Sequence, residues 1–226
     1  MVDPSNITKY NCSDFELQEL ILFWICVAGK KANTISRILE NFLQEGFKKF
    51  GCSKPFDVIL SYKDDLPQEL KKHGIGCYNN KSKTMLELAK SNIDLKNCHV
   101  DDLESIYGIG MKTSRCFLLH SRENAEYAGL DTHILKFMKI LGYDVPKSTP
   151  VKNKYKKIEK DFLYLVKKSG LSAQDVDLLI WNYFSQRIVN DEFKTLLVSI
   201  NTKESLVFLK HIGQRNEKLL VRTEQD

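Results

Sequence analysis

Apolar residues recur at helical rather than alternating spacing along most of this chain, which limits the folds it can adopt. Ile35, Ile38, Leu39 and Phe42 follow the i, i+3, i+4, i+7 pattern of a helix with one buried face. Only five prolines and eleven glycines interrupt the 226 residues. The pattern predicts an all-α protein of about ten short helices. Residues 196–200 are the one segment that could instead form a strand, although nothing in the sequence supplies a partner for it.

The size and composition of the chain fit a globular protein. Its residues are 42% hydrophobic and 10% aromatic, enough to form the core of one or two domains. The longest apolar run, 20–28, is much shorter than the roughly 20 residues that cross a bilayer, and residues 1–10 lack the apolar region of a secretory signal. We expect a soluble intracellular monomer without membrane contact, located in the cytoplasm or nucleoid, or in the nucleus if its source has one.

The cysteines and histidines do not follow the spacings of a metal site. The six cysteines are at least fourteen positions apart, so no Cys-x-x-Cys pair exists, and the five histidines include no His-x-x-x-His pair. Structural zinc and iron–sulfur sites usually take two thiolates from one short turn. We therefore expect reduced, mostly buried thiols, no metal and no cofactor.

The most informative segment of the sequence is 101–120. Asp101 or Asp102 is expected to cap a short helix that ends at Tyr107, and a second helix begins at about Met111. The residues between them, Gly108-Ile109-Gly110, predict a tight hairpin in which Ile109 packs between the two helices. Backbone N–H groups at such a turn can bind a phosphate oxygen. An ordinary helix–helix turn is the alternative interpretation.

Lys112 favours the functional interpretation of this hairpin. A cation in the first turn of a helix lies at the positive end of the helix dipole, which costs a few tenths to about 1 kcal/mol. The same field favours a neutral amine, which is the nucleophilic form. A free lysine has a pKa near 10.4, and bringing such a value to about 7 costs about 4 kcal/mol. Burial in a cleft between two helical domains would have to supply most of that free energy.

Asp131 is the second candidate catalytic residue. It precedes an amphipathic helix at the N-cap position, nineteen residues after Lys112. An ordinary N-cap contributes about 1 kcal/mol to stability, and that role alone would explain an aspartate at this position. The two roles are compatible, because a carboxylate that caps a helix is held rigidly.

Together these motifs resemble the helix-hairpin-helix DNA glycosylases, the superfamily of endonuclease III and 8-oxoguanine glycosylase. The matching order is Gly-Ile-Gly-x-Lys-Thr at 108–113 followed by Leu-Asp-Thr-His-Ile at 130–134. Residues 76–82, Gly-Cys-Tyr-Asn-Asn-Lys-Ser, are similar to the Gly-Leu-Tyr-Asn-Ser-Lys-Ala turn of endonuclease III. The chain departs from the family at Tyr107, where many members have proline, and it lacks the C-terminal four-cysteine loop of the iron–sulfur members.

The resemblance implies two helical subdomains with a catalytic cleft between them. The first would comprise residues 30–125 and carry the helix-hairpin-helix, and the second would comprise 1–29 plus 126–226. Lys112 matches the Schiff-base lysine of the bifunctional members, and Asp131 matches their catalytic aspartate. Gly108 and Gly110 match the phosphate-gripping hairpin, and Ile109 between them is counted with the DNA-binding residues.

Further DNA-contacting and base-recognising residues follow from the same resemblance. Tyr78 is the candidate wedge or stacking residue, and Lys30 and Lys31 are candidates for contacting phosphate or the orphaned partner base. Asp177 and Trp181 lie at i, i+4 on one expected helix face, so an acceptor and an aromatic ring could share a pocket. That segment resembles the Asp-x-Leu-Leu-Trp helix of archaeal-type 8-oxoguanine glycosylases. A core tryptophan beside a solvated aspartate is the alternative.

The sequence therefore predicts a glycosylase with AP-lyase activity that removes an oxidised base, 8-oxoguanine in the first instance, from double-stranded DNA. The archaeal group's own hairpin differs from Gly-Ile-Gly, so an endonuclease III-like activity on oxidised pyrimidines, without a cluster, remains open. A non-catalytic helix-hairpin-helix module and a helical protein-interaction domain are the competing interpretations. Residues 147–168 hold eight lysines and two acids, which indicates either a solvated helix face or a surface for a polyanion.

Overall fold

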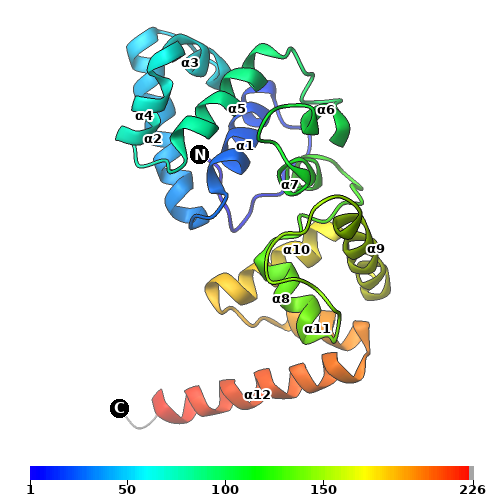
Figure 1. Ribbon diagram of the computed structural model, residues 1–226. Coiled ribbons are helices and arrows are strands. Elements are labelled where there is room, and N and C mark those ends of the chain that lie inside the picture. The colour runs from blue at the N-terminus through cyan, green and yellow to red at the C-terminus, as the bar shows by residue number, and fades with distance from the viewer. Residues whose placement is uncertain (224–226) are drawn as a thin grey trace. The chain divides into compact units, whose positions relative to one another are not determined.

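The computed structural model describes residues 1–223, with side chains to residue 213, and all regular secondary structure in that part of the chain is helical (Figure 1). The chain forms two compact units, Met1–Ala125 and Glu126–Asp226. Residues 224–226, which were expected in the second domain, lie outside the described residues. In the described part, the helices are too short or too polar to cross a membrane.

The first unit contains seven α-helices and a short 3-10 turn. They are α1 (Asp14–Val27), α2 (Ala32–Phe50), α3 (Pro55–Tyr62), η1 (Lys63–Asp65), α4 (Leu66–Lys72), α5 (Tyr78–Lys90), α6 (Val100–Glu104) and α7 (Met111–Ser121). α1 begins with a capping box in which the Ser13 hydroxyl accepts from the N–H of Glu16 and the Glu16 carboxylate accepts from the N–H of Ser13.

Helix α1 is the central helix of the first unit. Its residues 20–23 are at most 5% exposed, so it is buried on almost every side. It packs against α2, α3, α5 and α7. This packing places residues 1–29 in the first unit, contrary to their expected place in the second. The apolar run showed that α1 is buried, but periodicity alone does not specify which helices cover it.

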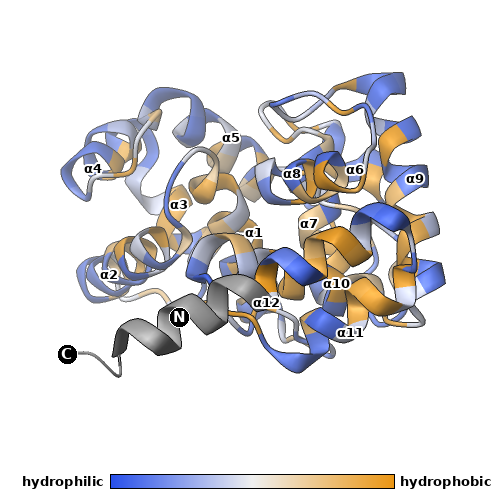
Figure 2. Ribbon diagram, turned by 90° about the horizontal axis from the view of Figure 1, so that it is seen from below, coloured by the Kyte–Doolittle hydropathy of each residue, from blue (hydrophilic) through white to orange (hydrophobic). Residues whose placement is uncertain are grey.

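The second unit contains α8 (Thr132–Ile140), α9 (Lys152–Ser169), α10 (Ala173–Trp181), the π-helical turn η2 (Asn182–Gln186), α11 (Asp191–Ile200) and α12 (Lys203–Thr223). An aromatic cluster fills part of its core. Tyr183 stacks on Phe193 with ring centres 4.6 Å apart, and Phe208 meets both rings edge-on. The hydropathy colouring in Figure 2 shows the apolar sides of α10 and α11 in orange.

Two expected elements differ from those observed. The helix before the hairpin begins at Val100 and ends at Glu104, and Asp102 lies in its first turn, where its carboxylate accepts from the N–H of His99 at 2.8 Å. Residues 196–200 belong to α11 and not to a strand. The Asn190 side chain accepts from the N–H of Phe193 and starts that helix.

Candidate active site

The predicted hairpin packs against helix α5. Gly108 has a φ of +81°, and a Cβ at this position would lie 2.2 Å from the Oγ1 of Thr84. The N–H of Tyr107 donates to the carboxylate of Glu87 at 2.9 Å. The Nζ of Lys83 lies 3.9 Å from the centre of the Tyr107 ring. Thus Tyr107 is anchored by two side chains of α5, and glycine is required at 108 by both conformation and space.

The second half of the hairpin leads into α7 without a capping side chain. Ile109 is buried, and its N–H donates to the carbonyl of Ile106 at 3.1 Å. Gly110 is the N-cap of α7, and a Cβ there would meet nothing within 4 Å. The N–H groups of the first turn of α7 therefore receive no side-chain cap, which is the arrangement that binds anions at helix N-termini.

Lys112 is the second residue of α7 and is half-buried. It makes no hydrogen bond or ion pair with any residue that the structure describes. Glu104, at the end of α6, accepts from the hydroxyl of Ser114 at 2.8 Å and forms an ion pair with the buried Arg115. This pairing ties α6 to α7 and fixes the start of the helix that carries Lys112.

Asp131 lies in the second unit as the N-cap of α8. Its Oδ1 accepts from the N–H of His133 at 2.8 Å and of Ile134 at 2.9 Å. The preceding residues 128–130 are buried. The hydroxyl of Tyr155 in α9 donates to the carbonyl of residue 128 at 2.6 Å and accepts from the N–H of residue 130 at 3.0 Å. The predicted cap is confirmed, and α9 holds the loop from which this carboxylate projects.

The base-recognition candidates lie on α10 in the same unit. Asp177 and Trp181 are both half-buried, and Trp181 is the last residue of the helix. The π-helical turn that follows contains Phe184, whose ring stacks on that of His133 with centres 6.1 Å apart. Because His133 is two residues after Asp131, the beginning of α8 packs on the segment that follows Trp181. Single π-turns of this kind often occur at functional sites.

Tyr78 and Lys30 lie at the N-terminal end of α5, ahead of the residues of this helix that contact the hairpin. Tyr78 begins α5, is half-buried, and has the Nζ of Lys71 at 5.6 Å from its ring centre. The Cε of Lys30 lies 2.8 Å from the place that a Cβ of Gly76 would take, so this side chain crosses the turn before Tyr78. Lys31 is exposed and is the N-cap of α2.

Sequence reasoning missed the role of Lys81 in this turn. Its side chain is buried, and its Nζ donates to the carbonyl of Cys26 in the last turn of α1 at 2.6 Å. Burial lowers the pKa of this amine. Lys81 thus holds the first turn of α5 against the end of α1. The lysine of the Gly-Cys-Tyr-Asn-Asn-Lys-Ser motif was visible in the sequence, but its long-range partner was not.

The two units thus carry different parts of the predicted site. The first unit carries the hairpin, Lys112, Tyr78 and Lys30, all of which lie in or next to α5 and α7. Unit two holds Asp131 and the pair on α10.

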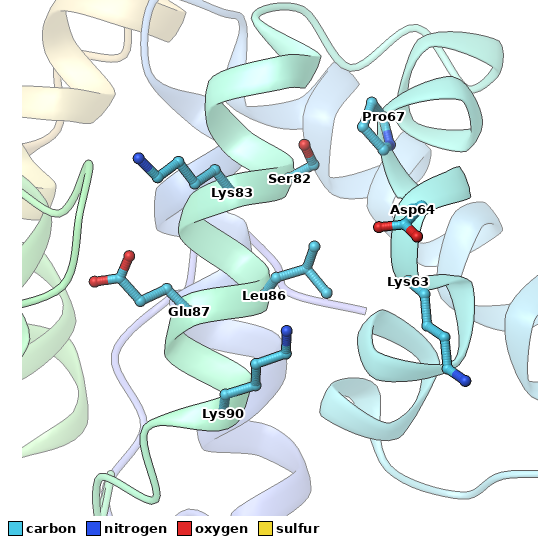
Figure 3. Close-up of a pocket in the computed structure, with 8 residues that line it drawn as sticks. All are labelled: Lys63, Asp64, Pro67, Ser82, Lys83, Leu86, Glu87 and Lys90. Atoms are coloured by element: carbon cyan, nitrogen blue, oxygen red, sulfur yellow. The ribbon is translucent and has the colours of Figure 1, made fainter.

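The structure also contains a cavity that includes none of the predicted residues. Its volume is about 460 Å³. Its lining residues are Lys63, Asp64, Pro67, Ser82, Lys83, Leu86, Glu87 and Lys90. Figure 3 shows Leu86 pointing from α5 towards Lys63 and Asp64, while Lys83 and Glu87 extend from the other side of the helix. Three lysines and two acidic residues line it, so its lining carries charges of both signs.

The described residues include no group of three or more His, Cys, Asp or Glu side chains that could hold a metal ion. The six cysteines are free thiols, and four of them are buried. Burial raises the pKa of Cys26 to about 12, so this thiol stays protonated at neutral pH.

The fold is similar to that of two solved structures from Methanocaldococcus jannaschii. One is an 8-oxoguanine glycosylase/lyase in complex with a 15-mer DNA containing 8-oxoguanine, with a TM-score of 0.61, 22% identity, and coverage of 80% of this chain and 86% of that chain. The other is an 8-oxoguanine DNA glycosylase, with a TM-score of 0.59, 22% identity, and coverage of 80% and 83%. No protein-family model matches the sequence. The chain therefore has the all-α fold of these glycosylases.

Proposed function

We propose that this protein is a DNA glycosylase with AP-lyase activity that acts on an oxidised base in double-stranded DNA. The observation that carries the proposal is the start of α7. There, uncapped backbone N–H groups follow a glycine hairpin, and Lys112 is half-buried without a partner among the described residues. An anion-binding turn next to an unpaired amine combines a grip for the DNA backbone with a nucleophile.

In the proposed reaction, the hairpin holds the backbone beside a nucleotide that has left the base stack. The neutral amine of Lys112 attacks C1′ of the sugar, the N-glycosidic bond breaks, and the base departs with the bonding electron pair. Asp131 accepts a proton from the attacking amine and stabilises the positive charge that develops on the sugar. The sugar ring then opens to an imine. Loss of a proton from C2′ expels the 3′ phosphate and nicks the strand.

We propose 8-oxoguanine as the substrate. The support comes from the Asp-x-Leu-Leu-Trp-like helix and from the fold neighbours, whose described substrate is this base. Asp177 would accept a hydrogen bond from the purine edge, and Trp181 would pack at the pocket. Tyr78, Lys30 and Lys31 would contact the opened duplex.

A panel of duplexes tests the activity. Each carries 8-oxoguanine, thymine glycol, uracil or an abasic site, and the measurement is nicked product under single-turnover conditions. We expect the wild-type protein to nick the duplexes that carry 8-oxoguanine or the abasic site, and Lys112→Gln to lose this activity. The control is Lys96→Gln, which removes an exposed lysine of the same unit and should nick at wild-type rates. Salt-sensitive binding without nicking of any duplex would indicate a non-catalytic DNA-binding module. Preferred nicking at thymine glycol would indicate the pyrimidine-specific activity.

A further inference from the structure

Helix α9 has one buried side and one side covered by lysines. Its buried residues are Tyr155, Ile158, Phe162, Leu165 and Val166. At 100° per residue, a second set of residues falls on the opposite side, and all of them are exposed. We call this set the α9 lysine face, and its members are Lys156, Lys157, Lys160, Tyr164, Lys167 and Lys168. Figure 2 shows the hydrophilic colour along much of α9.

The stability of the helix does not account for this charge. Lys156 and Lys157 lie four and three residues before Lys160, so like charges are neighbours on the surface and repel. The first turn of α9, which precedes the face, also contains lysines (Lys152 and Lys154) and no acid, although the helix dipole favours the reverse. The face makes no ion pair within the described part of the chain. Only the two lysines of the last turn, Lys167 and Lys168, are placed favourably for the dipole.

The α9 lysine face is separate from the part of the site that holds Asp131. Tyr155 and Glu159, on other sides of α9, hydrogen-bond to the backbone of residues 128 and 130. Those contacts fix the side of α9 that carries the loop. At 100° per residue, Lys157, Lys160 and Tyr164 fall on a different side of α9 from these two residues.

We infer that the α9 lysine face binds the sugar–phosphate backbone of duplex DNA without regard to a lesion, at a place distinct from the hairpin. This inference rests on the proposed function, because it takes DNA as the polyanion. From Lys156 to Lys168 the face is about 18 Å long at 1.5 Å per residue, which matches about five base-pair steps of 3.4 Å. Tyr164, which is 61% exposed, adds a hydroxyl in the middle of the face. Lysines that face phosphates gain affinity through counterion release and read no sequence.

The test compares two triple variants with the same loss of charge. One is Lys157→Gln/Lys160→Gln/Lys167→Gln, and the control is Lys48→Gln/Lys54→Gln/Lys96→Gln, which removes three exposed lysines of the first unit. Binding to a lesion-free duplex is measured at several salt concentrations, and circular dichroism checks the folding of both. We expect the negative slope of log K against log salt to become shallower by about 2.7 in the first variant, at about 0.9 per phosphate contact, and to stay at the wild-type value in the control.

Single-turnover nicking of a saturating 8-oxoguanine duplex is expected to be unchanged in the first variant, because the hairpin and Lys112 are intact. Equal slopes for the two triple variants would overturn the inference and would favour an acidic protein surface as the partner of this face. That result would leave the proposed function in place. Wild-type protein that shows no salt-sensitive DNA binding would instead overturn the proposed function.

Discussion

Substitution of Gly108 by alanine tests the packing of the hairpin on α5. A residue other than glycine at a φ of +81° costs about 1–2 kcal/mol. The added Cβ would also lie 2.2 Å from the Oγ1 of Thr84, and overpacking of this kind costs about 1–3 kcal/mol. We therefore expect Gly108→Ala to lower the free energy of unfolding by about 2–5 kcal/mol. Gly110→Ala is the matched control, because its Cβ would meet open space, and we expect a loss of at most about 1 kcal/mol, the cost of alanine at an N-cap.

The steric part of this loss should depend on Thr84. In Gly108→Ala/Thr84→Ala the close atom is gone, so a double-mutant cycle should give a coupling of about 1–3 kcal/mol, while the conformational cost remains. Urea unfolding with linear extrapolation supplies the free energies. The first unit contains Trp24 and the second contains Trp181. In a Trp181→Phe background, fluorescence therefore reports on the unit that carries the hairpin.

Two results would refute this reasoning. One is a Gly108→Ala variant that loses no more stability than Gly110→Ala. The other is a double-mutant cycle in which the Thr84 substitution restores none of the free energy of unfolding that Gly108→Ala loses. Either would mean that the hairpin does not approach α5 as closely as the structure has it.

Three further substitutions separate packing from chemistry. Asp131→Asn should keep the helix cap, so we expect the free energy of unfolding to change by no more than about 0.5 kcal/mol. The same substitution should lower the single-turnover nicking rate by a factor of about 10²–10⁴. An unchanged rate would mean that this carboxylate serves only as a helix cap. Tyr155→Phe removes both hydrogen bonds to the loop at 128–130 and should cost about 1–3 kcal/mol in urea unfolding, so a neutral effect would contradict the geometry. Hydrogen bonds from Lys9 and from the cap of α1 lower the pKa of Glu16 from 4.5 to about 2. The ionised carboxylate therefore stabilises the folded protein above pH 4.5, and this contribution is lost as the pH falls towards 2. Glu16→Gln should therefore cost at most about 1 kcal/mol at pH 7 and nothing near pH 2, and a gap that persists at pH 2 would refute the assignment.

Local signals in the sequence were sufficient for the local structure of part of the candidate site. The start of α7 at Met111 and the cap at Asp131 depend on residues within a few positions, and both are observed. For the same reason the helical pattern of α11 was present in the sequence, since Phe193, Leu196 and Ile200 share one buried face. Residues 196–200 alone do not show this pattern, because so short an apolar run does not distinguish a strand from a helix.

Contacts between distant segments could not be predicted in this way. The role of α5 as the support of the hairpin depends on Thr84 and Glu87, which are about twenty positions away from the residues they contact. The place of α1 in the first unit likewise depends on which helices cover its buried apolar residues. Neither question is answered by periodicity, because many partners can bury the same apolar face.

The measurement that tests the central claim most directly is borohydride trapping on DNA followed by mapping of the linked peptide. Wild-type protein is incubated with an 8-oxoguanine duplex and reductant, and the adduct is digested and sequenced by mass spectrometry. We predict that the DNA is attached to Lys112 and that Lys112→Gln forms no adduct. Attachment to another amine, or nicking by the wild-type protein without any trapped adduct, would contradict the assignment of the nucleophile.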